Sequence, residues 1–204
     1  MSQVKPTRQE LLSYKKKIKT ASKGHRLLKD KRDGLIQKFL GVVKEALHTR
    51  EEVTQEMRQA IEYFHYAEAK TSEEYLANIA QASDTEIQIE NLVHNFMGVH
   101  LTDLTFSVTG DPFQYGVLNT PKDLDQSITT FYQALPKLIK LAELEYKARK
   151  LAEEIEKTRR RVNALEHVII PQMKTDKKEI ESILEERARQ EKVTIMKAKE
   201  LLDL

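Results

Sequence analysis

The sequence contains no cysteine or tryptophan, and few residues that break helices or build sheets. Its 204 residues include only 6 glycines and 5 prolines, and aromatic residues make up 6%. Without cysteine the chain can form neither a disulfide nor a thiolate metal site, which fits a reducing compartment. The composition therefore indicates long helices rather than a sheet-based enzyme.

The sequence also lacks a long apolar run. No apolar stretch approaches the roughly 20 residues that a helix needs to cross a bilayer. The first residues, MSQVKPTRQE, lack the apolar core of a signal peptide. We therefore expect a soluble, cytoplasmic protein with no direct insertion into a membrane.

Charge is abundant, at 32% of residues, and it is unevenly distributed although the net charge is only +2. Residues 1–50 carry 14 Lys and Arg against 4 Asp and Glu, residues 51–130 carry 3 against 14, and residues 131–204 carry 17 against 14. Both terminal segments are basic and the middle is acidic. If the chain folds back on itself, these segments produce a rod with one basic and one acidic end.

Apolar residues spaced by three and four predict a long N-terminal helix over residues 7–82. The heptad spacing lasts for about five repeats, which is typical of a coiled coil rather than of an ordinary amphipathic helix. We call the line of residues expected to pack against a partner helix the seam. In this helix the seam includes Leu11, Ile18, Leu28, Leu35, Phe39 and Val42.

The same spacing predicts a second long helix over residues 121–204. Its seam includes Leu151, Ile155, Val162, Leu165 and Ile169, and weakens from Asp176 onward. Pro136 is expected to start or bend a helix. Pro171 is expected to kink one, because proline removes a hydrogen bond and crowds the preceding turn.

The central region, residues 83–120, has a different pattern. Residues 85–89 and 99–102 alternate apolar and polar side chains on either side of Gly98, which predicts a short β-hairpin. Its strands are expected to contain Ile87, Ile89, Val99 and Leu101. Residues 107–121 hold two glycines and two prolines and are expected to form a loop.

These elements predict a fold dominated by α-helix. The two long helices pair most simply as an intramolecular antiparallel coiled coil, because the central hairpin and loop let the chain reverse. Residues 1–204 would then form a single elongated unit. A homodimer joined through the same seams is the structural alternative.

No recognisable catalytic or nucleotide-binding motif is present. The closest glycine pair, Gly110 and Gly116, is not followed by lysine and has Pro112 where phosphate-binding amides are needed. No Ser or Lys stands in a recognisable nucleophile motif. We therefore expect no catalytic residue, no cofactor and no enzymatic activity in this chain.

Two Glu-x-x-His pairs, Glu45 with His48 and Glu62 with His65, have a spacing that di-iron helical bundles use. They lie 17 residues apart on one predicted helix, which is about 25 Å at the standard rise. The two pairs are too far apart to share a metal pair. We therefore interpret them as charged surface positions and predict no metal site.

Basic residues gather in residues 15–19, in residues 23–32 and at Arg159–Arg161. Such clusters can neutralise phosphates, but no aromatic stacking platform accompanies them. Solvated helix faces are the simpler interpretation, so we expect no nucleic-acid binding. A role at a membrane surface is disfavoured because the coiled coil uses the apolar stripe.

Two segments carry a resemblance to a known family. Residues 6–39, PTRQELLSYKKKIKTASKGHRLLKDKRDGLIQKF, and residues 153–171, EEIEKTRRRVNALEHVIIP, resemble the paired signatures of the D subunits of V-type and A-type rotary ATPases. In layout the resemblance covers nearly the whole chain. It implies a central-stalk shaft that turns inside a ring of catalytic and regulatory subunits and couples ATP hydrolysis or synthesis to ion movement through a membrane rotor.

The resemblance also implies partners and a contact surface. The partners would be the catalytic and regulatory subunits of the ATPase head, the small central-stalk F subunit and a membrane-rotor adaptor subunit. The end of the coiled coil that holds the termini would enter the head. Six cations are predicted to contact the head there: Lys29, Lys31, Arg32, Arg159, Arg160 and Arg161.

Such a subunit would be cytoplasmic and peripheral to the membrane as part of the complex, and its catalytic residues would belong to other subunits. An alternative function is a free-standing coiled-coil scaffold or nucleic-acid-binding rod. Salt-sensitive binding of DNA or RNA would distinguish that alternative.

Overall fold

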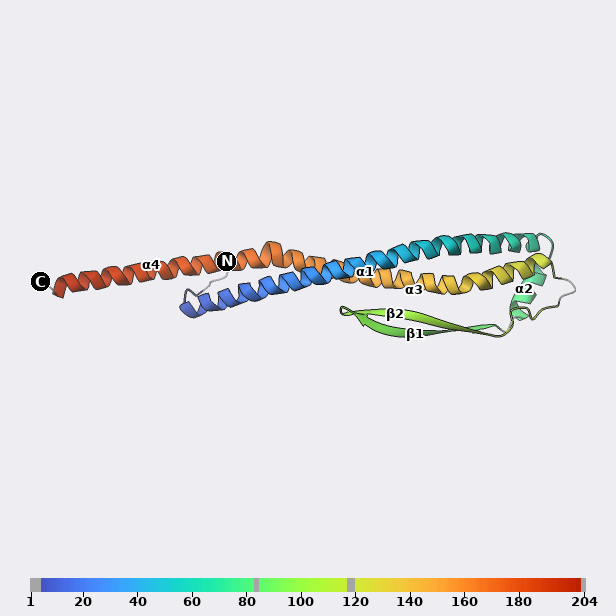
Figure 1. Cartoon of the computed structure of the whole chain (residues 1–204), viewed down its shortest axis with the longest axis horizontal. Helices are drawn as coiled ribbons and strands as arrows, with labels where there is room; N and C mark the ends of the chain where they lie inside the picture. Colours follow the sequence, from blue (N-terminus) through green and yellow to red (C-terminus); the bar gives the residue numbers. More distant parts are fainter. Residues whose placement is uncertain (1–4, 83–84, 117–119, 203–204) are drawn as a thin grey trace. The chain divides into compact units, whose positions relative to one another are not determined.

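The computed structural model describes residues 5–82, 85–116 and 120–202, and its elements are long helices interrupted by one hairpin (Figure 1). In chain order they are α1 (Arg8–Glu68), α2 (Glu73–Ala82), β1 (Glu86–Phe96), β2 (Val99–Thr109), α3 (Lys122–Ala164), a π-helical turn (Leu165–Ile169) and α4 (Ile170–Leu202). They belong to two compact units, which we describe separately. Unit 1 is Met1–Gly34 with Ile155–Leu204, and unit 2 is Leu35–Glu154.

Helix α1 begins at a capped turn and ends earlier than the sequence analysis predicts. The backbone N–H of Glu10 donates to Oγ1 of Thr7 at 3.2 Å, as in the capping boxes that open many helices. The helix ends at Glu68, and α2 starts afresh at Glu73, so the prediction of one helix to residue 82 is wrong. Neither glycine nor proline marks this break. Ser72 and the acidic first turn of α2 favour a new helix start there.

In unit 1 the N-terminal part of α1 pairs with α4 and the end of α3. Lys15 contacts Glu181 at 3.3 Å, while His25, further along α1, contacts Glu166 at 3.3 Å. The partner number falls as the α1 number rises, so the two segments are antiparallel. Thr158, Val162 and Ile180 are almost fully buried in this unit.

In unit 2 the second half of α1 pairs with α3 in the same antiparallel manner. The buried hydroxyl of Ser127 donates to the carbonyl of Ala60 at 2.7 Å. Further along, Arg50 contacts Glu145 at 2.5 Å. The buried apolar residues of this pair are Leu35, Val42, Val53, Ala60, Ala67, Leu124, Ala134, Leu144 and Leu151.

The fold class predicted from the sequence is therefore confirmed. Two long helical segments of one chain pack against each other, and an antiparallel two-stranded hairpin lies between them in sequence. Pro136 lies inside α3 and does not end it. Pro171 follows a π-helical turn, in which the N–H of Ile170 bonds to the carbonyl of Leu165.

The hairpin is confirmed and is longer than predicted. Strands β1 and β2 pair over eleven consecutive positions from Glu86–Thr109 to Phe96–Val99. Their two-residue turn has Met97 and Gly98 at positive φ (51° and 83°), and Asn95 Oδ1 accepts the N–H of Gly98 at 2.8 Å. The backbone twist of such a turn matches the right-handed twist of the strands. Its positive φ angles favour glycine, which is found at position 98.

Candidate functional site

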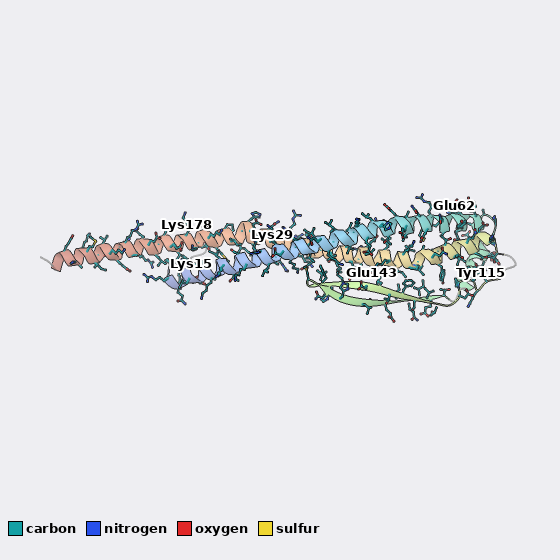
Figure 2. All side chains as sticks on the ribbon, in the orientation of Figure 1. Lys15, Lys29, Glu62, Tyr115, Glu143 and Lys178 are labelled. Atoms are coloured by element: carbon teal, nitrogen blue, oxygen red, sulfur yellow. The ribbon has the colours of Figure 1, made fainter. Side chains whose placement is uncertain are left out.

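The six cations predicted as contacts all lie in unit 1. Lys29 and Arg159–Arg161 are exposed, whereas Lys31 and Arg32 are half-buried. Lys29 projects from α1 in Figure 2. The two clusters lie on α1 and on the last turns of α3, so one helix pair presents both.

Some of these cations already have intramolecular partners. Arg32 donates through Nε and Nη2 to Oδ1 of the adjacent Asp33, at 3.0 and 2.8 Å. Arg160 is 77% exposed and pairs with Glu156 one turn earlier. Exposed pairs of this kind contribute less than about 1 kcal/mol, so an acidic partner surface can replace them at little cost.

The predicted seam, which runs through both units, differs in one place from the expected spacing. Among the predicted seam residues, Leu35, Val42, Leu151 and Val162 are buried, and Leu11, Ile18, Leu28, Phe39, Ile155 and Leu165 are half-buried. Ile169, however, is 38% exposed.

The π-helical turn explains the exposure of Ile169. The turn inserts one residue, so the packed line steps by five from Leu165 to the half-buried Ile170 and continues to Ile180. Sequence reasoning expected a kink at Pro171 and missed the π turn. The proline was the available signal, because its missing N–H disturbs the regular hydrogen-bond pattern.

Beyond the π turn, a polar contact joins α1 to α4 in unit 1. The hydroxyl of Tyr14 donates to Oδ2 of Asp176 at 3.3 Å, and Gln172 donates to Oδ1 of the same carboxylate at 2.8 Å. Asp176 is only 8% exposed. Burial, followed by the nearby Asp176 carboxylate, raises the pKa of Tyr14, so the hydroxyl stays protonated as a donor.

The hairpin in unit 2 buries only part of its apolar residues. Val99 and Leu101 on β2 are 7% and 0% exposed, whereas Ile87 and Ile89 on β1 are 43% and 56% exposed. Sequence reasoning predicted these four strand residues but did not identify the face that packs on the helices. The missing information was the position of α3, which a local alternation pattern does not contain.

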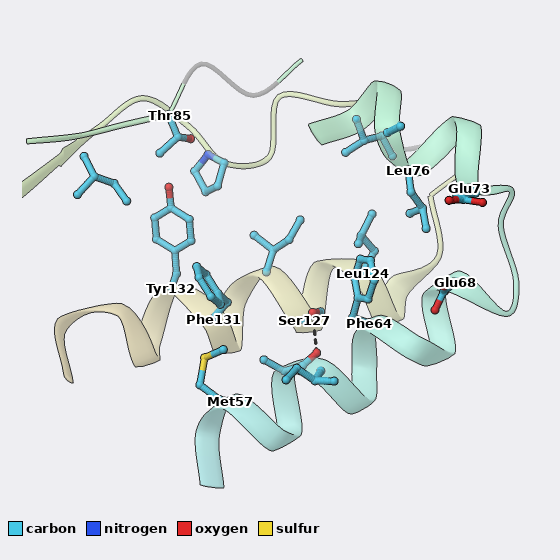
Figure 3. Close-up of a pocket in the computed structure, with 17 residues that line it drawn as sticks. Met57, Phe64, Glu68, Glu73, Leu76, Thr85, Leu124, Ser127, Phe131 and Tyr132 are labelled. Carbon is cyan, nitrogen blue, oxygen red and sulfur yellow. Dashed lines mark hydrogen bonds between the residues drawn. The ribbon is translucent and has the colours of Figure 1, made fainter. Parts of the chain in front are cut away.

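Unit 2 also contains an apolar hollow of about 810 Å³ (Figure 3). It lies between the C-terminal end of α1, the N-terminal end of α3, helix α2 and the start of β1. Its lining includes Phe64, Leu76, Leu124 and Phe131. Glu68 and Glu73 are the carboxylates in the lining. This arrangement offers apolar contact area rather than a nucleophile with a neighbouring base.

Comparison with known proteins places these features in a family. The family model for the D subunit of ATP synthase matches residues 10–200. The chain belongs to the family of ATP synthase D subunits.

Individual relatives agree over nearly the full length. The V-type ATP synthase D subunit of Thermoanaerobacter sp. (strain X514) is 41% identical, over 99% of this chain and 98% of the relative. The V-type ATP synthase D subunits of Clostridium novyi (strain NT) and Clostridium botulinum (strain ATCC 19397 / Type A) are each 38% identical, over 98% of this chain and 95% of the relative. The match therefore covers both units and the hairpin.

The Glu-x-x-His pairs of this family member lie on the surface of α1. His48 is 76% exposed and contacts Glu52 at 3.3 Å, and His65 is 69% exposed and contacts Glu68 at 3.2 Å. Within the described ranges, no group of three or more His, Asp or Glu residues is placed to hold a metal ion. Across those same ranges, no helix is long and apolar enough to span a membrane.

Sequence reasoning missed one charged cluster of this D-subunit fold. Glu143 and Lys147 on α3 are 3% and 8% exposed, and they join Asp103 and the backbone N–H of Leu104 on β2. Their i,i+4 spacing resembles that of an ordinary surface ion pair. Their bonds to β2 depend on the position of the hairpin, which the sequence does not place.

Proposed function

We propose that this chain is the non-catalytic central-stalk shaft of a rotary ATP synthase, transmitting torque between the ATP-hydrolysing or ATP-synthesising head and the membrane ion-translocating ring. The match to the family of ATP synthase D subunits over residues 10–200 carries this proposal. The antiparallel helix pairs in both units support it, because interlocked helices resist unwinding better than a single helix.

The surface of unit 1 is the proposed contact with the head. Lys29, Arg159, Arg160 and Arg161 are exposed there. A turning shaft needs contacts that form and break repeatedly, and exposed charge pairs meet this need because each is weak. An asymmetric cationic surface would also present a different face to each catalytic interface and so favour different states of each.

The remaining parts of the chain provide surfaces for the other proposed partners. The acidic middle of the sequence, with its exposed β1 strand and apolar hollow, is the proposed region of contact with the small F subunit and the membrane-rotor adaptor subunit. In this role the chain is cytoplasmic and peripheral to the membrane. ATP chemistry then belongs to the catalytic subunits.

Reconstitution with the head subunits tests the proposed assembly. Full-length chain is mixed with the catalytic and regulatory subunits, and the complex is isolated by size exclusion and imaged by electron microscopy. We expect one copy along the central axis of the head, with Arg159–Arg161 facing the catalytic and regulatory subunits. A chain that never joins the complex, or that joins it at the periphery, would overturn the proposal.

A further inference from the structure

The hairpin of unit 2 packs on the helices mainly through β2, and the contact of β1 with α1 is made by Phe96, whose ring centroid lies 5.9 Å from Nζ of Lys38. Strand β1 is exposed along nearly its whole length, whereas β2 buries Val99 and Leu101. An isolated two-stranded hairpin is marginally stable in water, so its attachment to the helices decides its position.

An ionic cluster crosses from α3 to β2, on the side of α3 that faces the hairpin (Figure 2). Lys147 Nζ donates both to Asp103 on β2 and, at 2.6 Å, to Oε1 of Glu143. The other oxygen of Glu143, Oε2, accepts the backbone N–H of Leu104 at 2.9 Å. We call these four groups, Asp103, Leu104 N–H, Glu143 and Lys147, the clasp.

Each half of the clasp has its own internal partners. On α3, Glu143 is bonded to Lys147 one turn later and to Lys140 one turn earlier, at 2.8 Å. On the hairpin, Asp103 Oδ2 lies 3.0 Å from Nδ1 of His94. Breaking an ordinary buried ion pair is costly because it leaves one charge buried and unpaired. Separating the halves of the clasp instead leaves Glu143 bonded to Lys140 and Lys147, and leaves the half-exposed Asp103 beside His94.

Separation also leaves the hydrogen bonds between β1 and β2 in place. The eleven paired positions of the ribbon involve no residue of α3. Undocking breaks the bonds of Asp103 and Leu104 to α3 and the contact of Phe96 with Lys38 on α1, and it uncovers the side chains of Val99 and Leu101. Because the ribbon keeps its own hydrogen bonds, the docked and released hairpin are two discrete arrangements of one folded element, related by a rigid-body movement.

We propose that the clasp is a releasable latch, and that the hairpin exchanges between a state docked on α3 and an undocked state whose population the clasp sets. The latch belongs to the isolated chain and does not depend on the proposed role as a shaft. Undocking exposes the face of α3 that carries Glu143 and Lys147, together with Leu101 of β2. Docked and undocked states therefore offer different surfaces to a partner.

Spin-label distances measure the latch directly. The chain has no cysteine, so His100→Cys on β2 and Ala152→Cys on α3, both exposed positions, can be labelled selectively in the full-length protein. In the doubly labelled protein without further substitutions, we expect one dominant distance between the two labels, which is that of the docked state. Glu143→Gln or Asp103→Asn should add a longer, broader component and raise the undocked-to-docked ratio at least tenfold, which corresponds to about 1.4 kcal/mol.

Two features of the design separate release of the hairpin from general unfolding. Asp103 has a side chain that is 47% exposed, so Asp103→Asn does not bury a new unpaired group in the helix pair. Glu145→Gln is the matched control, because Glu145 lies on the same helix but pairs with Arg50 instead of the hairpin. Its distance distribution should equal that of the background.

The latch is overturned if Glu143→Gln and Asp103→Asn both leave the distance distribution unchanged. It is also overturned if the longer component appears only together with a loss of helical circular dichroism, because the hairpin would then separate only when the helices unfold. A longer component with full helicity in either variant, absent from Glu145→Gln, supports it.

Discussion

Arg160 and Arg161 test the proposed contact with the head at the scale of single residues. Both are exposed on α3, and Arg160 pairs with Glu156 on the same helix. Replacing both arginines with glutamate should lower assembly or coupled ATPase activity at least several-fold, because two attractive contacts become repulsive. Helix content should stay unchanged. Assembly and ATPase assays with circular dichroism measure both results.

The matched control for this variant lies on the same helix. Arg149 and Lys150 are an adjacent cationic pair on α3 but belong to unit 2 and to no predicted contact. Charge reversal there should leave assembly with the head intact. If the double variant Arg160→Glu with Arg161→Glu assembles with the head as well as this control does, the two arginines make no contact with the head that matters for assembly.

Thr158 tests the packing of the seam in unit 1. Its side chain is 1% exposed, and its Oγ1 has no hydrogen-bond partner among the described residues. An unpaired buried hydroxyl is destabilising, so Thr158→Val, which keeps the shape, should raise the free energy of unfolding by about 1 kcal/mol. Urea denaturation measures this change. A destabilised valine variant would show that the hydroxyl has a bonding role.

At the scale of elements, the hairpin should be separable from the helices. Its ribbon pairs only with itself, and the helix pairs have their own buried seams. Deleting residues 86–109 and joining the ends with a short flexible linker should leave most helicity and change partner binding or ATPase rate. Circular dichroism and reconstituted assays test this. General loss of helix would contradict it.

The attachment of the hairpin should also depend on pH. Burial opposes the ionisation of Glu143, but bonds from Lys140, Lys147 and the Leu104 N–H hold its pKa below its ordinary 4.5. The bond from Lys147 holds the pKa of Asp103 below its ordinary 3.8. A lowered folded-state pKa contributes stability that is present above the ordinary pKa and is lost as pH falls through the folded value.

Docking should therefore be strongest at neutral pH and weaken below about pH 4, because protonation weakens the two bonds that cross the clasp, from Lys147 to Asp103 and from the Leu104 N–H to Glu143. Burial lowers the pKa of Lys147, but its bonds to Asp103 and Glu143 outweigh this effect and raise the pKa above 10.5. Its contribution is thus lost only in strong alkali. The spin-labelled protein, titrated from pH 7 to pH 3, measures the docked fraction. A docked fraction that stays unchanged from pH 7 to pH 3 would contradict the role of Asp103 and Glu143 in holding the hairpin.

The sequence predicts which helices and strands form better than it predicts where they begin and end or what they contact. Spacing by three and four locates both long helices, because burial of one helix face leaves a repeating trace in the chain. It does not show the break after Glu68, where no glycine or proline interrupts the pattern. It also cannot show the π turn before Pro171 or the burial of Glu143, because both depend on how distant segments pack.

At the scale of the whole molecule, the proposed function requires that the chain carry torque. Each unit contains an antiparallel helix pair, and α1 and α3 contribute to both units. Torque would therefore pass along continuous backbone rather than across a loop. The Gly34–Leu35 division between the units falls inside α1, where glycine weakens a helix by roughly 1 kcal/mol relative to alanine.

The central claim is that this chain turns relative to the head as ATP is hydrolysed. A bead attached through a cysteine introduced at the exposed Ala152, in a complex whose head is fixed to a surface, reports that motion directly. The account predicts rotation in one direction that begins with ATP and stops when ATP is removed. A bead that stays still while the same complexes hydrolyse ATP would contradict it.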